Sequence, residues 1–156
     1  MDVDGLIQDL KRGIGMVRVN AAVELGKLKD KKSEQALIDA LGDENLAVRN
    51  NAAFALGEFG SRTAVPRLIF LLHDPEERVR KSVVKALGMI CDHDAEASLI
   101  QVLETDESRI VKKSALRSLG QIGGPKTIPA VKPFLSDPDP LLADMAKKAI
   151  ELINKR

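Results

Sequence analysis

The sequence predicts an all-α protein, a right-handed α-α superhelix (solenoid) of about ten short helices with a repeat of about 31 residues. Three observations predict this fold class. One twelve-residue pattern recurs along the chain, its apolar residues follow the period of an α-helix, and no segment shows the alternation of a strand. Because the pattern fills the chain, we expect a single repeat domain over residues 1–156.

The recurring pattern predicts one helix per repeat, which we name helix A. Its copies begin at Val17, Val48, Val79 and Val111, with a weaker copy at Leu142. They read VRVNAAVELGKL, VRNNAAFALGEF, VRKSVVKALGMI, VKKSALRSLGQI and LADMAKKAIELI. The apolar residues stand three and four positions apart, which places them in one stripe along a helix.

A second segment lies between these copies and predicts a second helix, named B. It reads VDGLIQDLKR, EQALIDALGD, VPRLIFLLHD, EASLIQVLETD and IPAVKPFLSD. Glycines such as Gly60 and pairs such as Asp74–Pro75 separate the helices. Neither helix of a pair can bury its stripe alone, so the pairs must stack.

These segments divide the chain into a first B helix, four A–B repeats and a last A helix. The expected units are residues 1–16, 17–47, 48–78, 79–110, 111–141 and 142–156. The expected helices lie near 3–11, 17–28, 33–41, 47–59, 63–73, 78–90, 95–104, 109–122, 127–135 and 140–153.

The pattern V-R-x-x-A-A-x-A-L-G, followed by a turn and an L-I-x-x-L helix closed by Asp-Pro, resembles the short HEAT-like repeat of the phycobilin-lyase (PBS lyase) type. The resemblance covers essentially all 156 residues. It implies that the A helices line the convex side of the solenoid and the B helices the concave side. It also implies a scaffold or adaptor without enzymatic activity, which binds a protein partner on the concave side.

The candidate partner site therefore lies at the B-helix positions outside the core stripe. Its centre is Phe70, an aromatic residue where the other repeats have polar residues or proline. Phe70 either anchors a partner or a second copy, within a polar rim, or folds back over neighbouring helices and enlarges the core. The candidate partner-binding residues are Gln35, Asp39, Arg67, Phe70, His73, Ser98 and Gln101.

Nucleic-acid binding is an alternative function. The chain has 24 basic and 23 acidic residues, a net charge of +1, no Trp or Tyr and four Phe, and this composition does not favour a nucleic-acid partner. A cluster of basic residues nevertheless marks the A helices of the last three repeats, which we expect on the convex side. Its members are Lys81, Lys85, Lys112, Lys113, Arg117, Lys147 and Lys148.

A bilin-lyase-like enzyme subunit is a further alternative, but the residues favour no enzyme and no cofactor. In the related deoxyhypusine hydroxylase family, His-Glu pairs hold iron at the two positions after V-R. Here those positions hold pairs such as Val19–Asn20 and Asn50–Asn51, and no His-Glu pair occurs. A bilin needs a cleft lined by aromatic residues, of which the chain has few.

The stretch MICDHDAE, residues 89–96, contains the chain's one cysteine and one of its two histidines. The repeat alignment makes it a turn between helices A and B, where Cys91 takes the place of Gly60. Asp92 or Asp94 is placed to cap helix B. The other histidine, His73, lies at the far end of a B helix. Because eleven helical residues at about 1.5 Å each separate the two ends of such a helix, the two histidines cannot share a metal ion. We therefore expect no metal site here.

The remaining features bear on location and on contacts between repeats. No signal-peptide pattern opens the sequence, no stretch approaches the roughly 20 apolar residues that span a bilayer, and a single cysteine fits a reducing compartment. We therefore expect a cytoplasmic protein with no membrane partner. A recurring base and a recurring acid predict a ladder of ion pairs between repeats, formed by Arg18, Arg49, Arg80 and Lys112 with Asp43, Asp74, Asp106 and Asp137.

The turn at residues 89–96 gives a first prediction. The double substitution Cys91→Ser and His93→Ala should change the free energy of unfolding by less than about 1 kcal/mol, as at ordinary surface positions. Urea unfolding measures this change. Zinc or iron bound stoichiometrically to the purified protein, and lost in the double variant, would contradict this interpretation of the turn.

Overall fold

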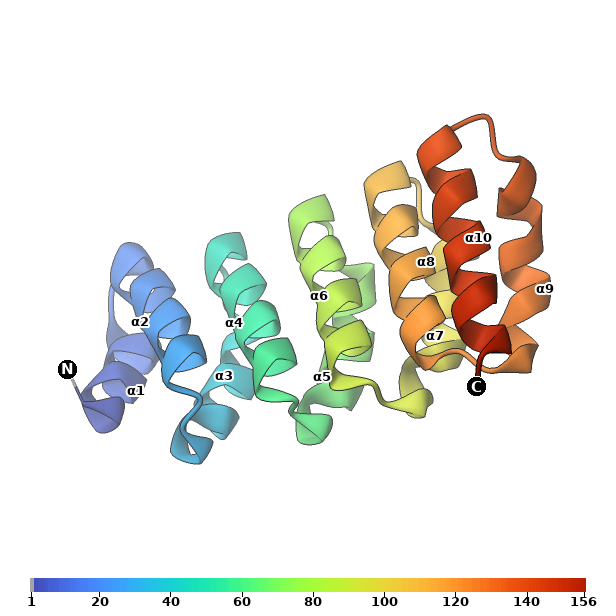
Figure 1. Cartoon of the computed structure of the whole chain (residues 1–156). Helices are drawn as coiled ribbons and strands as arrows, with labels where there is room; N and C mark the ends of the chain where they lie inside the picture. Colours follow the sequence, from blue (N-terminus) through green and yellow to red (C-terminus); the bar gives the residue numbers. More distant parts are fainter. Residues whose placement is uncertain (1) are drawn as a thin grey trace.

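A computed structural model describes residues 2–156, which form a single curved array of paired helices (Figure 1). The described residues contain α-helices, 3-10 turns and no strand, so the expected all-α solenoid of the right-handed superhelical class is confirmed. The A helices are α2 (Gly15–Leu28), α4 (Leu46–Phe59), α6 (Glu77–Ile90), α8 (Arg109–Ile122) and α10 (Pro140–Asn154). The B helices are α1 (Val3–Arg12), α3 (Glu34–Ala40), α5 (Val65–Phe70), α7 (Glu96–Thr105) and α9 (Ile128–Val131).

The B helices are short and are extended by 3-10 turns. Four such turns precede them: η1 (Lys31–Ser33), η2 (Arg62–Ala64), η4 (His93–Ala95) and η5 (Pro125–Thr127). Two follow them: η3 (Leu71–His73) after α5 and η6 (Lys132–Ser136) after α9. The helix expected over 127–135 is therefore α-helical over only four residues. Pro133 lies just beyond α9 and has no N–H to continue the α-helical bonding.

The core lies between the layer of A helices and the layer of B helices. Each A helix contributes a leucine to it, such as Leu56 and Leu87, and each of these side chains is fully buried. The B helices contribute Leu37, Leu68 and Leu99 from the other side, also fully buried. The leucines recur with the repeat, so the core is one continuous strip along the array.

Neighbouring A helices meet at a glycine of one helix and a small residue of the next, a contact line that we call the glycine seam. A Cβ atom added at Gly57 would lie 2.7 Å from the Cα of Ala86, and one added at Gly120 would lie 3.0 Å from the Cα of Ala149. Gly26 approaches Ala55 in the same way. Glycine is required at these positions because any side chain would push the two helices apart.

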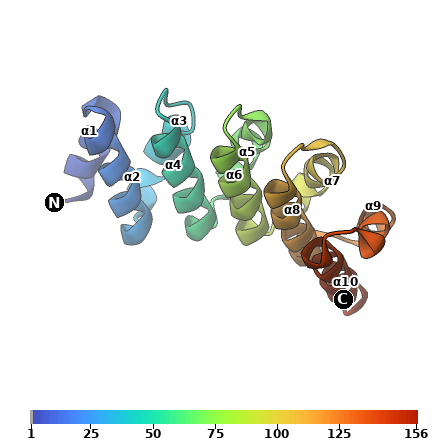
Figure 2. The same cartoon turned by 90° about the horizontal axis from the view of Figure 1, so that it is seen from above.

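The array bends toward the A helices. Neighbouring A helices are in extensive contact, whereas neighbouring B helices contact one another far less. Seen from above, α8 and α10 lie on the inner side of the bend and α7 and α9 on its outer side (Figure 2). The expectation that the B helices line the concave side is therefore wrong. The glycine seam shortens the A layer, so the A helices form the inner face and the B helices the outer face.

The expected ladder of ion pairs is present for three of its four rungs. The Nε atoms of Arg18, Arg49 and Arg80 lie 2.8, 2.7 and 2.8 Å from carboxylate oxygens of Asp43, Asp74 and Asp106. The hydrogen bond that each arginine donates to its aspartate raises the pKa of that arginine, although partial burial acts in the opposite direction. Each rung therefore joins the start of one A helix to the loop before the next.

Arginine rather than aspartate bridges two loops in each rung. The Nη1 group of Arg49 donates to the backbone carbonyl of Asp43 at 2.9 Å, while its other nitrogens donate to Asp74. Asp74 in turn accepts a hydrogen bond from the backbone N–H of Glu76 at 2.9 Å. Because these groups are mostly buried, each rung fixes the conformation of two successive loops.

The fourth rung uses a different residue from the one expected. Asp137 pairs with Arg109, one turn before Lys112 on α8. Lys112 instead lies over the ring of Phe134, 5.8 Å from its centroid. A lysine cannot reproduce the forked contacts of the three arginines, so the longer-reaching Arg109 at the start of the helix replaces it.

A second contact between repeats starts from the first residue of a B helix. The carboxylate of Glu96 accepts hydrogen bonds from the Thr127 hydroxyl at 2.6 Å and the Gly124 backbone N–H at 2.9 Å. Partial burial alone would raise the pKa of Glu96, but these two hydrogen bonds outweigh it, and the pKa lies below the ordinary value of 4.5. Glu34 makes the equivalent contact with the hydroxyl of Ser61 at 2.5 Å.

The glycine seam predicts the effect of one methyl group. Gly57→Ala should lower the free energy of unfolding by about 2–3 kcal/mol, because the new Cβ overlaps the backbone of α6. Urea unfolding followed by circular dichroism measures the loss. Gly42→Ala is the control, since its Cβ would lie 3.2 Å from the side-chain end of Arg67 and 3.5 Å from the Asp39 carbonyl oxygen, an ordinary contact distance, and it should change stability by less than about 0.5 kcal/mol. Equal effects of the two substitutions would contradict the role of the seam.

The Glu96 contact predicts a pH dependence. A carboxyl whose pKa is lower in the folded state stabilises the protein above its unfolded-state pKa, and this contribution is lost as the pH falls through the folded-state pKa. Glu96→Gln should therefore cost about 1–2 kcal/mol at pH 7, and the difference from wild type should shrink below about pH 4.5. Urea unfolding between pH 7 and about 3.5 measures this, with Glu151→Gln on the exposed face of α10 as the control. A difference that does not change with pH would contradict the assignment.

Candidate functional site

The outer face carries the seven residues expected to bind a partner, spread over three B helices. On α3 the Gln35 amide donates a hydrogen bond to the Asp39 carboxylate at 2.9 Å, and both side chains are exposed. Arg67 and Phe70 lie exposed on α5, the next B helix. Phe70 has 71% of its surface exposed, so it does not fold back into the core. Of the two alternatives for Phe70, enlargement of the core is excluded.

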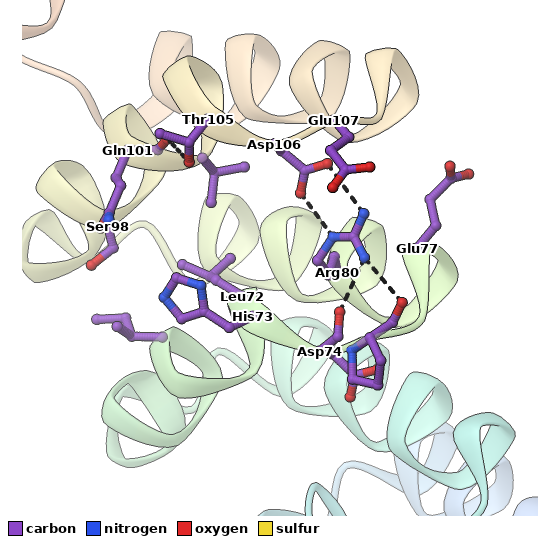
Figure 3. A pocket seen from close by; sticks show the side chains of 13 residues that line it. Leu72, His73, Asp74, Glu77, Arg80, Ser98, Gln101, Thr105, Asp106 and Glu107 are labelled. Atoms are coloured by element: carbon purple, nitrogen blue, oxygen red, sulfur yellow. Dashed lines mark hydrogen bonds and ion pairs between the residues drawn. The ribbon is translucent and has the colours of Figure 1, made fainter.

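The other three candidate residues come together in a groove between η3 and α7 (Figure 3). The groove has a volume of about 580 Å³, and His73, Ser98 and Gln101 line its outer part. Phe70 does not line the groove, but it directly follows Ile69, which does. The remaining lining residues are Leu72, Asp74, Pro75, Glu77, Arg80, Val102, Thr105, Asp106 and Glu107.

The floor of the groove is the ladder rung formed by Arg80 and Asp106 (Figure 3). Because Asp106 and the backbone carbonyl of Asp74 occupy the guanidinium of Arg80, this cation is already engaged within the protein. Glu77 and Glu107 stand at the rim, and neither makes an ion pair with any of residues 2–156. The groove therefore presents unpaired carboxylates, an imidazole and amide groups to the surroundings.

The acidic rim was not predicted from the sequence. Glu77 and Glu107 stand three residues and one residue after a ladder aspartate, Glu77 as the first residue of α6 and Glu107 in the loop before α8. The recurrence of that aspartate was a usable signal, because it placed both loops on one edge of the solenoid. What the sequence could not indicate is that a groove remains between η3, α7 and those loops.

The turn with Cys91 and His93 is a capped turn, as expected. Cys91 ends α6 in the left-handed backbone conformation with φ of 57°, the place that Gly60 takes after α4 with φ of 71°. Asp92 is the cap, and its carboxylate accepts a hydrogen bond from the Asp94 N–H at 3.0 Å. Within residues 2–156 no group of three or more His, Cys, Asp or Glu side chains is placed to hold a metal ion.

The basic cluster lies on the inner face, so its expected convex position is wrong. The correction has the same cause as the correction of the curvature, because these residues belong to A helices (Figure 2). Two of its members leave the cluster: Lys112 contacts Phe134, and Lys148 forms an ion pair with Asp144 at 2.7 Å. Lys81, Lys85, Lys113 and Arg117 remain on α6 and α8, and Lys147 remains on α10.

None of the helices in residues 2–156 combines the length and the apolar character needed to cross a membrane.

Comparison with solved structures identifies the type of the repeat. The chain is similar to a chain of the complex of CpcE and CpcF of phycocyanin lyase from Nostoc sp. PCC7120, with 31% identity and a TM-score of 0.89. The match covers 100% of this chain and 66% of that chain, so this chain spans slightly less than two thirds of its length. The repeat of this protein is therefore of the phycobilin-lyase type.

Two further structures share the fold at lower identity. A designed armadillo repeat protein in complex with the peptide (KR)4 has 20% identity and a TM-score of 0.77, over 97% of this chain and 82% of that chain. Human deoxyhypusine hydroxylase has 21% identity and a TM-score of 0.68, over 99% of this chain and 74% of that chain. No curated protein matches the sequence. The family model for HEAT repeats matches residues 3–69, 36–100 and 96–155, and the chain therefore belongs to the family of HEAT-repeat proteins.

Proposed function

We propose that this protein is a non-enzymatic interaction module that binds another protein through the outer face of its solenoid. The observation that carries the proposal is the exposure of Phe70. Phe70 has 71% of its surface in water, whereas Val65, Leu68 and Ile69 of the same helix are buried or half-buried, so its burial by a partner is favourable.

The surroundings of Phe70 have the anatomy of a protein-binding hot spot. Arg67 stands one turn before it on the same face of α5, and Asp39 and Gln101 occupy the equivalent positions on the neighbouring B helices. An aromatic anchor within a polar rim is the usual arrangement at the centre of an interface, where the rim excludes water. Asp39 is already oriented by Gln35, which favours a preformed rim.

The groove beside Phe70 adds room for a partner side chain or loop. Its volume of about 580 Å³ lies within the range of sites that accept a peptide segment or a small ligand. His73 and Gln101 supply donors and acceptors there, and Glu77 and Glu107 supply negative charge at the rim. A partner that covers Phe70 and places a basic or amide side chain in the groove satisfies both features.

A lyase-type enzyme subunit is the second candidate, and the similarity to the phycocyanin lyase complex is the observation that favours it. The chain corresponds to about two thirds of that neighbour, and the lyase activity is that of the complex of CpcE and CpcF. Addition of a bilin to the purified protein, followed by its absorption spectrum, tests this candidate. A shifted spectrum with stoichiometric binding would replace the proposal of a non-enzymatic module.

Phe70→Ala should weaken binding of the partner, or self-association, by at least about 2 kcal/mol, or about thirtyfold. Capture of proteins from the source organism, repeated with the purified partner in calorimetry, gives the partner affinity, and sedimentation velocity gives the self-association. Because the side chain is mostly exposed, the free energy of unfolding should change by less than about 1 kcal/mol.

Phe54→Ala is the matched control, since it removes the same group from the inner face, where Phe54 is 44% exposed. It should leave binding by the outer face within about twofold of wild type. If Phe70→Ala and Phe54→Ala bind the partner equally well, the outer face is not the site.

A further inference from the structure

The inner face is divided along its length into an apolar part and a cationic part. Two positions one turn apart on each A helix lie on the side of the helix opposite its core stripe, and they form this face. On α2 and α4 these positions hold mostly apolar residues, on α6 and α8 only cations, and on α10 a paired acid and base. The residues in order are Val19, Val23, Asn50, Phe54, Lys81, Lys85, Lys113, Arg117, Asp144 and Lys148.

The four cations of α6 and α8 form a compact group that we call the cation square. Lys81 and Lys85 are one helical turn apart, as are Lys113 and Arg117. The glycine seam between Gly88 and Ser118, where an added Cβ would lie 2.8 Å from the Ser118 Cβ, holds the two helices close together. Neighbouring packed helices are about 8–10 Å apart and residues one turn apart about 6 Å, so four positive charges share a small area.

No protein group neutralises the cation square. None of its four members makes an ion pair with residues 2–156, whereas other lysines on A helices have acidic partners, as Lys27 has Glu24 and Lys148 has Asp144. Like charges one turn apart destabilise a helix. The square is therefore unfavourable in the isolated protein and is relieved when an anionic group binds.

A small apolar pocket lies on the same face, at the other end. It has a volume of about 170 Å³ between α2 and α4. Ala22, Val23, Phe54 and Ala55 form its apolar walls, and Lys27, Asn51 and Glu58 also line it. The volume is well below that of a pocket for a drug-sized molecule, so it fits one aliphatic or aromatic side chain. Gly26, which closely approaches Ala55, also lines the pocket.

The pocket and the cation square lie at a distance that one extended chain can span. The pocket lies between α2 and α4 and the square on α6 and α8, so their centres are two helix spacings, or about 20 Å, apart. An extended chain advances about 3.3 Å per residue and covers this distance in about six residues. We propose that the inner face binds an extended acidic polypeptide segment, with an apolar residue in the pocket and a group of carboxylates on the cation square about six residues away.

The two features together favour a polypeptide over a nucleic acid. Four cations neutralise few phosphates, and no aromatic residue stands in the square to stack on a base. A phosphate backbone also has no group that fits the apolar pocket. The proposal concerns the inner face, whereas Phe70 lies on the outer face. A negative result for one site therefore does not bear on the other.

Fluorescence anisotropy with synthetic peptides tests the proposal on the full chain. The probe is a labelled peptide with one leucine, a linker of about five glycine and serine residues, and a run of about four glutamates. We expect saturable binding that weakens with salt. A peptide with leucine changed to serine, or with leucine next to the glutamates, should bind at least about fivefold more weakly.

Charge reversal locates the binding site. Lys85→Glu together with Arg117→Glu should weaken peptide binding at least about tenfold, because two charge-assisted contacts are lost. Lys31→Glu together with Arg62→Glu changes the net charge equally on exposed turn residues and is the control, expected within about twofold of wild type. Phe54→Ala should also weaken binding, whereas Phe70→Ala should leave it unchanged.

Three binding results would overturn the proposal. The first is that wild type does not bind the leucine-glutamate peptide saturably. The second is that the square variant and its control bind the peptide equally well. The third is that short DNA displaces the peptide at a lower concentration than unlabelled peptide does. The last result would assign the square to phosphate. Thermal unfolding checks each variant, and the square variant should be at least as stable as wild type because it removes like-charge repulsion. A square variant that unfolds at lower temperature than its control would contradict the repulsion on which the proposal depends.

Discussion

The close approach of successive A helices at the glycine seam is the constraint on which the rest of this structure depends. Gly57 against Ala86 and Gly120 against Ala149 leave no room for a side chain, and this contact recurs at each junction of A helices. Because the B helices have no such seam, their layer is longer, and the array must bend toward the A layer (Figure 2). The curvature, and with it the identity of the inner and outer faces, follows from a few small side chains.

The ion-pair ladder supplies what the seam cannot, a fixed geometry for the loops. Apolar packing is nearly indifferent to small rotations, whereas Arg49 must meet Asp74 and the carbonyl of Asp43 at defined angles. The pairs of Arg18, Arg49 and Arg80 are largely shielded from water, so each stabilises the fold more than an exposed pair would, although desolvation offsets part of this gain. The change to Arg109 in the last rung indicates that the position of the carboxylate, not the position of the base, is what the repeat keeps constant.

Most of the fold could be predicted from the sequence, because helix period and repeat length are local properties. The position of all ten helices, the capped turn at Cys91 and three ladder rungs followed from spacing alone. The direction of curvature did not, since it depends on the difference in length between two layers and was inferred from a resemblance. The sequence did contain the signal, in the small residues of the A helices. The exposure of Phe70 could not be predicted, because an aromatic side chain on a short helix can turn toward either the core or water.

The repeat separates the residues that fold the protein from the residues that are free to vary. Within each A helix, the positions of Val79, Val83 and Leu87 face the core and Gly88 forms the seam, which leaves the positions of Lys81 and Lys85 with no structural duty. At such positions a single charge costs little in folding, but like charges one turn apart repel one another, so the cation square is accounted for by the binding that we propose and not by stability. The same reasoning applies to Phe70 on the outer face. A solenoid built in this way can carry two unrelated surfaces, since the seam and the ladder hold the backbone whatever those surfaces present.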